Sequence, residues 1–253
     1  MARIQLVTRG DDAGSSYSAN RAIGEAATTG MLRNISLMAC GPCFDDAAKV
    51  LCALPDVDFG LHVTLNAEWD APRWGPLSPR DEVLSLLDND GCFTRAPKVL
   101  LERDADADEM LREVEAQLQR ARDAGFSISY LDEHMGVGGL PGLGTRLRGL
   151  CRREGLRYAG LVPSLPAAPE PLPDLLDNLE ARLHAAAPGV YTFVTHPTFD
   201  DEEVQSIARD GVALGQIARE RDADRRLFSA ARLPEILKRA DAVVVRYSDV
   251  LTP

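Results

Sequence analysis

Short runs of apolar and β-branched residues recur along the chain and alternate with segments of helical periodicity. Runs of about four to eight such residues are typical of strands that are buried on both faces of a sheet. On this basis we predict strands over residues 4–8, 34–39, 57–63, 127–131, 157–160, 191–195 and 242–247.

The segments between these runs carry apolar residues at helical spacing. Helices are predicted over residues 18–29, 44–53, 106–124, 143–154, 173–186, 201–210 and 230–240. The clearest is 106–124, because Val114, Leu118 and Ala121 fall on one face. Gly125 follows at the position where a glycine commonly ends a helix.

Alternating strands and helices favour a parallel sheet with helices packed outside it. The number of strands predicts an α/β fold of the TIM-like (β/α) barrel type, incomplete because it falls short of eight units. A doubly wound open sheet is the second expectation. We find no repeat and no linker, so residues 1–253 are predicted to form a single domain. Two long segments, 66–97 and 163–173, are predicted to be loops.

The composition narrows the classes of partner. The chain has 253 residues, 45% hydrophobic and 26% charged, with a net charge of −11. Nucleic acids and membrane surfaces are disfavoured because both select basic faces. No apolar segment approaches the roughly 18 residues of a membrane span, and we identify no signal peptide. Five cysteines, an odd number, favour a reducing cytoplasm over a disulfide framework.

Candidate chemistry gathers where predicted strands end. Asp11 and Asp12 follow the first strand, while His62, His134 and His196 end or follow three others. The carboxyl ends of parallel strands meet at one rim, where active sites are built. Adjacent carboxylates repel each other, so the pair makes sense with a cation between them, or with one carboxylate binding a metal while the other moves a proton.

Purely structural roles are the alternative interpretation of the same residues. A single histidine at a strand end is more often structural, and an Asp-Asp turn is more often a loop cap. The fourth histidine, His184, lies in a helical pattern and is expected at the surface. Three histidines and the aspartate pair on one rim nevertheless favour a metal site, because two imidazoles and a carboxylate form a common ligand set with open positions.

Two further motifs have competing interpretations. Cys40 and Cys43 enclose Gly-Pro after a predicted strand and before a helix, the context of a thiol redox motif, although a simple turn is favoured. Trp69 and Trp74 could stack on a sugar ring or equally anchor the long loop that carries them.

Several stretches, taken in order, resemble the YdjC-like carbohydrate deacetylase family. They span essentially the whole chain, and the ordered set is more specific than any one motif. The stretches are Asp11-Asp12-Ala13-Gly14 with Asn20 and Ile23, Ser36-Leu37-Met38 with Gly41-Pro42, Gly60-Leu61-His62-Val63-Thr64-Leu65 with Glu68-Trp69, Arg73-Trp74-Gly75-Pro76-Leu77, Leu131-Asp132-Glu133-His134-Met135-Gly136, Thr195-His196-Pro197 and Arg219-Glu220-Arg221-Asp222.

The resemblance implies a barrel-like fold, a divalent metal and removal of acetyl groups from N-acetylated sugars. By resemblance, the metal ligands are Asp12, His62 and His134. Asp11 matches the catalytic carboxylate, the expected general base, and His196 matches a histidine that lines the site and is expected to protonate the departing amine.

Other details of the resemblance leave room for alternatives. Arg219 and Asp222 are expected to orient the catalytic groups. Gly136 stands where many members have a second histidine, which bears on the substrate. The metal is expected to be zinc or magnesium, and a homodimer is possible.

Three other functions are alternatives to a carbohydrate deacetylase. They are a thiol oxidoreductase built on Cys40 and Cys43, a non-catalytic sugar-binding module, and another metal hydrolase such as a phosphoesterase.

Overall fold

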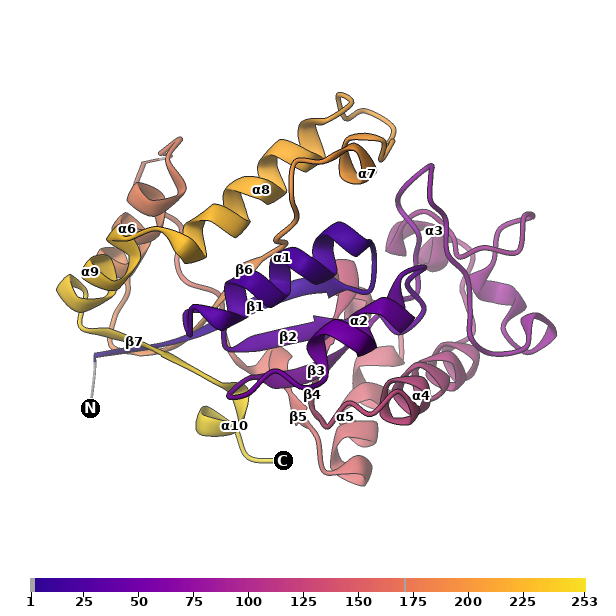
Figure 1. Ribbon diagram of the computed structural model, residues 1–253. Coiled ribbons are helices and arrows are strands. Elements are labelled where there is room, and N and C mark those ends of the chain that lie inside the picture. Colours follow the sequence, from indigo (N-terminus) through magenta and orange to yellow (C-terminus); the bar gives the residue numbers. More distant parts are fainter. Residues whose placement is uncertain (1–2, 171) are drawn as a thin grey trace.

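The computed structural model describes residues 3–170 and 172–253, and its seven strands form one parallel sheet. The strand order is β5-β4-β3-β2-β1-β6, with β7 also paired to β1. The sheet curls into an open half-barrel with helices around it, so the predicted incomplete barrel is confirmed (Figure 1). The strands are β1 (Ile4–Ala13), β2 (Asn34–Leu37), β3 (Asp58–Val63), β4 (Ile128–Glu133), β5 (Arg157–Tyr158), β6 (Gly189–Thr195) and β7 (Ala242–Val245).

The long strand β1 pairs with three other strands. One of its edges pairs with β6, whereas its other edge is shared by β7 along the first half and β2 along the second. Where β7 and β2 meet, the Asn34 side-chain amide donates hydrogen bonds to Thr8 O at 2.9 Å and Val245 O at 3.1 Å. Strand β1 extends beyond the predicted range 4–8, because it continues to Ala13 and so contains the aspartate pair.

Helices cover the sheet and supply the other half of the core. Their inner faces bury apolar side chains, such as Ile23 and Phe44, against strand residues such as Ile35 and Leu61. The helices are α1 (Tyr17–Thr28), α2 (Phe44–Leu51), α3 (Pro97–Glu102), α4 (Ala107–Asp123), α5 (Leu143–Glu154), α6 (Leu175–Ala185), α7 (Glu202–Gln205), α8 (Gln216–Ser229), α9 (Arg232–Arg239) and α10 (Tyr247–Val250). Within the described ranges, none of them is long and apolar enough to cross a membrane.

Several helical regions differ from the sequence prediction, among them the short α3 and α10, which were not predicted. The predicted helix over 201–210 is only the short α7, while the longer α8 was not predicted. Helix α8 is rich in charged residues, and the side chains it buries include an aspartate, Asp222, beside Leu227 and Phe228. Its apolar repeat is therefore too weak to indicate a helix by periodicity.

The two predicted loops attach closely to the barrel. The start of the 163–173 segment lies along β6, where Thr192 N donates to Pro163 O at 2.8 Å. The 66–97 segment is held by the buried Glu113 of α4, whose carboxylate accepts hydrogen bonds from Leu77 N at 3.1 Å and Ser78 N at 2.9 Å. These contacts fix the long segment beside the carboxyl end of the sheet.

Candidate metal centre

A bulge in β1 aims both aspartates into the barrel. Successive side chains of a regular strand point to opposite faces, but the register of β1 on β2 shifts between Gly10 and Ala13. Asp12 also has φ 65°, the left-handed region that non-glycine residues rarely occupy. As a result, Asp12 Oδ1 lies 3.5 Å and Asp11 Oδ2 lies 4.0 Å from His62 Nε2.

Close backbone packing supports this bulge. A Cβ on Gly14 would lie 2.8 Å from Met38 O, and a Cβ on Gly41 would lie 2.3 Å from Gly14 O, so neither position accepts another residue without movement. Asn20 adds a side-chain hydrogen bond, because its Oδ1 accepts from Gly14 N at 2.7 Å. The turn from Cys40 to Cys43 thus serves as a support for the aspartate loop.

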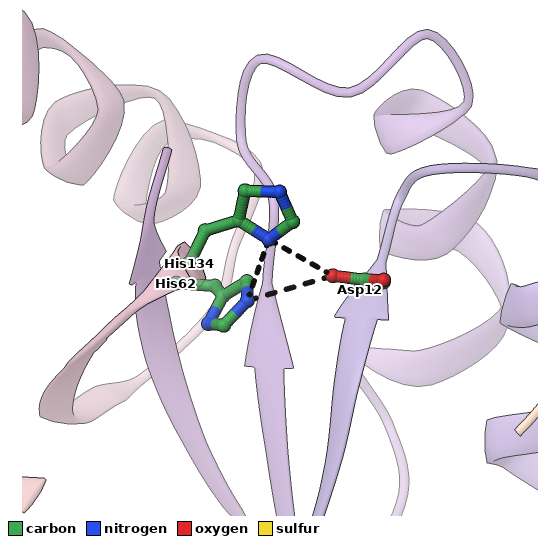
Figure 2. A group of neighbouring side chains, drawn as sticks. All are labelled: Asp12, His62 and His134. Atoms are coloured by element: carbon green, nitrogen blue, oxygen red, sulfur yellow. Dashed lines mark hydrogen bonds and ion pairs between the residues drawn. The ribbon is translucent and has the colours of Figure 1, made fainter. Parts of the chain in front are cut away.

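Three ligand-type atoms from different strands converge in front of the bulge. Asp12 belongs to β1, His62 to β3 and His134 to the turn after β4, and all three are buried (Figure 2). Asp12 Oδ1 lies 3.3 Å from His134 Nδ1, and His134 Nδ1 lies 3.2 Å from His62 Nε2. Atoms that bind one ion at about 2.0–2.2 Å are themselves separated by roughly 3–3.5 Å. The spacing of this triad therefore fits a single metal ion.

The outer nitrogens of both imidazoles face carboxylates. His62 Nδ1 lies 2.8 Å from Asp132 Oδ1, and His134 Nε2 lies 3.0 Å from Glu68 Oε2. A carboxylate on the outer nitrogen keeps a proton there and leaves the inner nitrogen with a free lone pair, the usual arrangement of metal-binding histidines. Two such lone pairs directed at each other across 3.2 Å require a proton or a cation between them.

The charge of the centre leads to the same conclusion. Four carboxylates, of Asp11, Asp12, Asp132 and Glu68, contact the triad or belong to it. Among the residues that the structure describes, two guanidinium groups, of Arg9 and Arg221, contact these carboxylates. Two negative charges are left over in a buried place, where unpaired charge is costly. A divalent cation would balance them.

Without a cation, protons on the imidazoles would balance the same charge. Burial disfavours the imidazolium form, but Asp12 and Glu68 outweigh burial and raise the pKa of His134 to about 9. Asp132 and Asp11 likewise hold the pKa of His62 well above its usual value, despite its burial. Metal binding must therefore displace protons, and the donor set of one carboxylate and two imidazoles suits that exchange.

Arg221 connects the triad to a cavity of about 560 Å³, which His196 also lines. Arg221 Nη2 lies 2.8 Å from Asp12 Oδ2, and its guanidinium lies over the Trp69 ring, 5.4 Å from the centroid. His196 follows β6 and lines the same cavity, and its backbone N–H donates to Asp224 Oδ2 at 2.8 Å. Burial lowers the pKa of His196.

Arg219 and Asp222, expected to orient the catalytic groups, are placed differently. Arg219 lines the cavity. The carboxylate of Asp222 pairs instead within its own helix, with Arg225 Nε at 2.8 Å, so the expectation for Asp222 is wrong. Arg221 and Asp224 of the same helix instead contact Asp12 and the backbone N–H of His196.

Four other charged residues of the centre were not identified from the sequence. Arg9, Glu68 and Asp132 each contact a residue of the aspartate pair or an imidazole, and so does Arg221. Asp132 could have been found, because it comes two residues before His134 and follows a predicted strand. The contacts of Glu68 and Arg221 depend on packing between elements that are distant in sequence, whereas Arg9 stands two residues before Asp11 on the same strand.

Both tryptophans anchor the 66–97 segment. Trp74 is buried and its Nε1 donates to Asn66 O at 2.8 Å, while the two indole rings meet edge to face with centroids 5.2 Å apart. Trp69 also lines the cavity beside Arg221. Both tryptophans therefore anchor the segment, and of the two Trp69 also lines the cavity.

The thiol alternative is not supported by the surroundings of the two cysteines. Burial raises the pKa of the Cys40 thiol well above its usual value and raises that of Cys43 to about 11. Reactive thiols need the opposite shift, because the thiolate is the nucleophile.

A Cys40→Ser, Cys43→Ser double variant is therefore expected to keep the activity of the wild-type protein. Hydrolysis rates and thiol–disulfide exchange are to be measured side by side on both proteins. Loss of activity in a variant that remains folded by circular dichroism would return the thiols to consideration.

The chain is similar to several known proteins. A family model described as YdjC-like protein matches residues 5–239. A carbohydrate deacetylase from Thermoanaerobacter pseudethanolicus is 34% identical over 129 residues, 51% of this chain and 49% of that protein. One from Thermus thermophilus is 38% identical over 128 residues, 50% of this chain and 46% of that protein. In both cases the match spans about half the length of the relative.

Longer matches extend over most of the chain. A carbohydrate deacetylase from Listeria welshimeri is 27% identical over 220 residues, 81% of this chain and 86% of that protein. The crystal structure of a protein from Enterococcus faecalis V583, named for cellobiose-phosphate cleavage, has a TM-score of 0.79 at 19% identity and covers 98% of this chain and 99% of its own. That structure supports the fold, and the family model spans nearly all of the sequence: the chain belongs to the YdjC-like family.

Proposed function

We propose that this chain is a metal-dependent hydrolase that removes the acetyl group from an N-acetylated amino sugar or a short oligosaccharide. The observation that carries the proposal is the pair of carboxylate-backed imidazoles whose inner nitrogens face each other and Asp12 Oδ1. The relatives named carbohydrate deacetylase supply the reaction class and the type of substrate.

Asp12, His62 and His134 would hold the ion. When bound there, a divalent metal supplies a Lewis acid that lowers the pKa of a water and polarises the acetyl carbonyl. One carboxylate and two imidazoles favour zinc, whereas magnesium prefers oxygen ligands and would need several waters. Zinc is therefore the first expectation and magnesium the second.

Asp11 is proposed to act as the general base. Its carboxylate lies beside the triad, and Arg9 outweighs the effect of burial and lowers the pKa of Asp11, so the group stays ionised and able to accept a proton. As Asp11 takes the proton of the water, the water oxygen bonds to the acetyl carbon. Breakage of the carbon–nitrogen bond then leaves acetate and an amine.

His196 is proposed to deliver a proton to the departing nitrogen. It lines the cavity next to Arg221, which itself contacts Asp12, and we propose that a sugar in this cavity directs its N-acetyl group toward the triad. The cavity volume of about 560 Å³ suits one or two sugar rings. Trp69 lies on the same wall, with the Arg221 guanidinium over its ring.

The proposal is tested by product analysis. The protein is treated with a chelator, reloaded with zinc or magnesium, and incubated with a set of N-acetylated mono- and oligosaccharides. Free amine and acetate are expected in equal amounts from at least one sugar, and the chelated protein is expected to be inactive until metal returns. A metal-loaded protein that binds a sugar and releases no amine would identify a binding module instead.

A further inference from the structure

A second group of ligand-type side chains lies directly beside the triad. Asp11, His62 and Asp132 are all buried, and each places one ligand atom within 4.8 Å of the others. The guanidinium of Arg9 lies between the two carboxylates: its Nε is 2.6 Å from Asp11 Oδ1 and 2.8 Å from Asp132 Oδ2. An arginine therefore occupies the position that a second cation would take.

The guanidinium of Arg9 is fixed by further hydrogen bonds. Its Nη2 donates to Asp11 Oδ2 at 2.7 Å, so that Asp11 is bound through both oxygens, and its Nη1 donates to Tyr247 OH at 3.1 Å. Asp132 is fixed as well, because its Oδ2 accepts from Ser36 Oγ at 2.6 Å while its Oδ1 faces His62. The guanidinium thus joins two carboxylates with different partners into one rigid unit.

We propose that Arg9 is a positioning residue: it bridges Asp11 and Asp132 and so sets the base and the orientation of His62 together. The inference rests on the proposed function, in which Asp11 accepts the proton of water. A bidentate guanidinium–carboxylate pair fixes both the distance and the plane of the carboxylate, which a lysine ammonium cannot do. Without the bridge, two buried carboxylates of like charge would lose the cation that lies between them.

A small cavity next to Arg9 allows a test in which added guanidinium ion restores the function of an Arg9 variant. This cavity, of about 180 Å³, is lined by Arg9, Asp132, Thr192 and Val194 and lies where the sheet is open between β5 and β6. An Arg9→Ala substitution would enlarge it by the volume of the lost side chain. A free guanidinium ion would then have room beside Asp11 and Asp132.

The test compares Arg9→Ala and Arg9→Lys with the wild type. In Arg9→Ala, kcat on the sugar that the wild type hydrolyses best is expected to fall about 10- to 100-fold, with KM and bound metal nearly unchanged. Low millimolar guanidinium chloride is expected to restore part of kcat, whereas sodium chloride and urea are not. Arg9→Lys is expected to stay impaired because it keeps the charge and loses the planar fork.

A second measurement does not depend on catalysis. Low guanidinium is expected to raise the Tm of metal-free Arg9→Ala, and an added Asp11→Asn substitution should abolish this effect. The matched control is Arg182→Ala, which removes a partly buried arginine that donates to Leu165 O at 2.8 Å and Pro166 O at 2.9 Å. Its kcat and its response to guanidinium should equal those of the wild type.

The outcomes separate this inference from the proposed function. Wild-type kcat in Arg9→Ala, or guanidinium that neither restores kcat nor raises the Tm, would overturn the positioning role. A wild-type protein inactive on every N-acetyl sugar would overturn the proposed function, and the Tm measurement would still decide whether Arg9 bridges the carboxylates. Where the alanine variant fails to fold, Arg9→Gln, which fills more of the space, replaces it in the kcat comparison without guanidinium, and a wild-type kcat in that variant would overturn the positioning role.

Discussion

Replacing His134 with alanine is expected to remove the bound metal and the hydrolase activity together while the chain stays folded. The substitution deletes the inner nitrogen that lies 3.3 Å from Asp12 Oδ1 and leaves Glu68 without its partner at 3.0 Å. Loss of one buried hydrogen-bond partner costs about 1–3 kcal/mol, which a protein of ordinary stability survives. Metal content is checked by elemental analysis after gel filtration, and folding by circular dichroism.

His184→Ala is the matched control, because it makes the same substitution at an exposed histidine of α6. That variant should keep both metal and activity. A folded His134→Ala protein that hydrolyses N-acetyl sugars at the wild-type rate would contradict the assignment of His134 as a ligand. Metal retained without activity would instead place His134 in the reaction itself.

Asp11→Asn is expected to keep the metal and to lower kcat by about 10²- to 10⁴-fold, the range that a general base contributes. The amide has the size of the carboxylate, but it cannot accept a proton from water. Arg9 keeps its contact with Asp132 at 2.8 Å, so the loop should retain its shape. Single-turnover kinetics and metal content are to be measured on the same preparation.

The same substitution at Asp12 is expected to have the opposite effect on metal content. Asp12→Asn should lose the metal, because Asp12 Oδ1 is the oxygen that faces both imidazoles. If Asp11→Asn lost the metal and Asp12→Asn kept it, the roles of the two carboxylates would be exchanged. Equal metal loss in both variants would make Asp11 a ligand as well.

The fold could be predicted because its strands are buried on both faces and therefore stand out as apolar runs. Six of the seven predicted helices recur over much of their predicted ranges for a similar reason, since each carries an apolar stripe. Helix α8 lacks such a stripe and was missed. A charged helix of this kind is positioned by ion pairs with the rest of the molecule, and local periodicity does not reveal these.

The residues around the centre could be predicted from the sequence because parallel topology brings strand ends to one rim. The choice of Asp12, His62 and His134 as the expected ligands came from the resemblance to the YdjC-like family, whereas this rule alone grouped the aspartate pair with three histidines. It could not show the bulge that turns Asp11 and Asp12 to the same side, because a bulge depends on the register with a neighbouring strand. Nor could it place Arg221, which reaches the centre from the helix that was not predicted.

The shared edge of β1 bears on how the molecule folds. Strands β7 and β2 meet on this edge through Asn34 and Val245, which are 211 residues apart in sequence. Contacts of such separation carry a large loop-closure entropy and slow the folding of a chain. Asp12 and Arg221 are nearly as distant, so the complete centre can assemble only after these long-range pairings have formed. The complete site therefore exists only in the native state, because partly folded forms bring together only some of its charged groups.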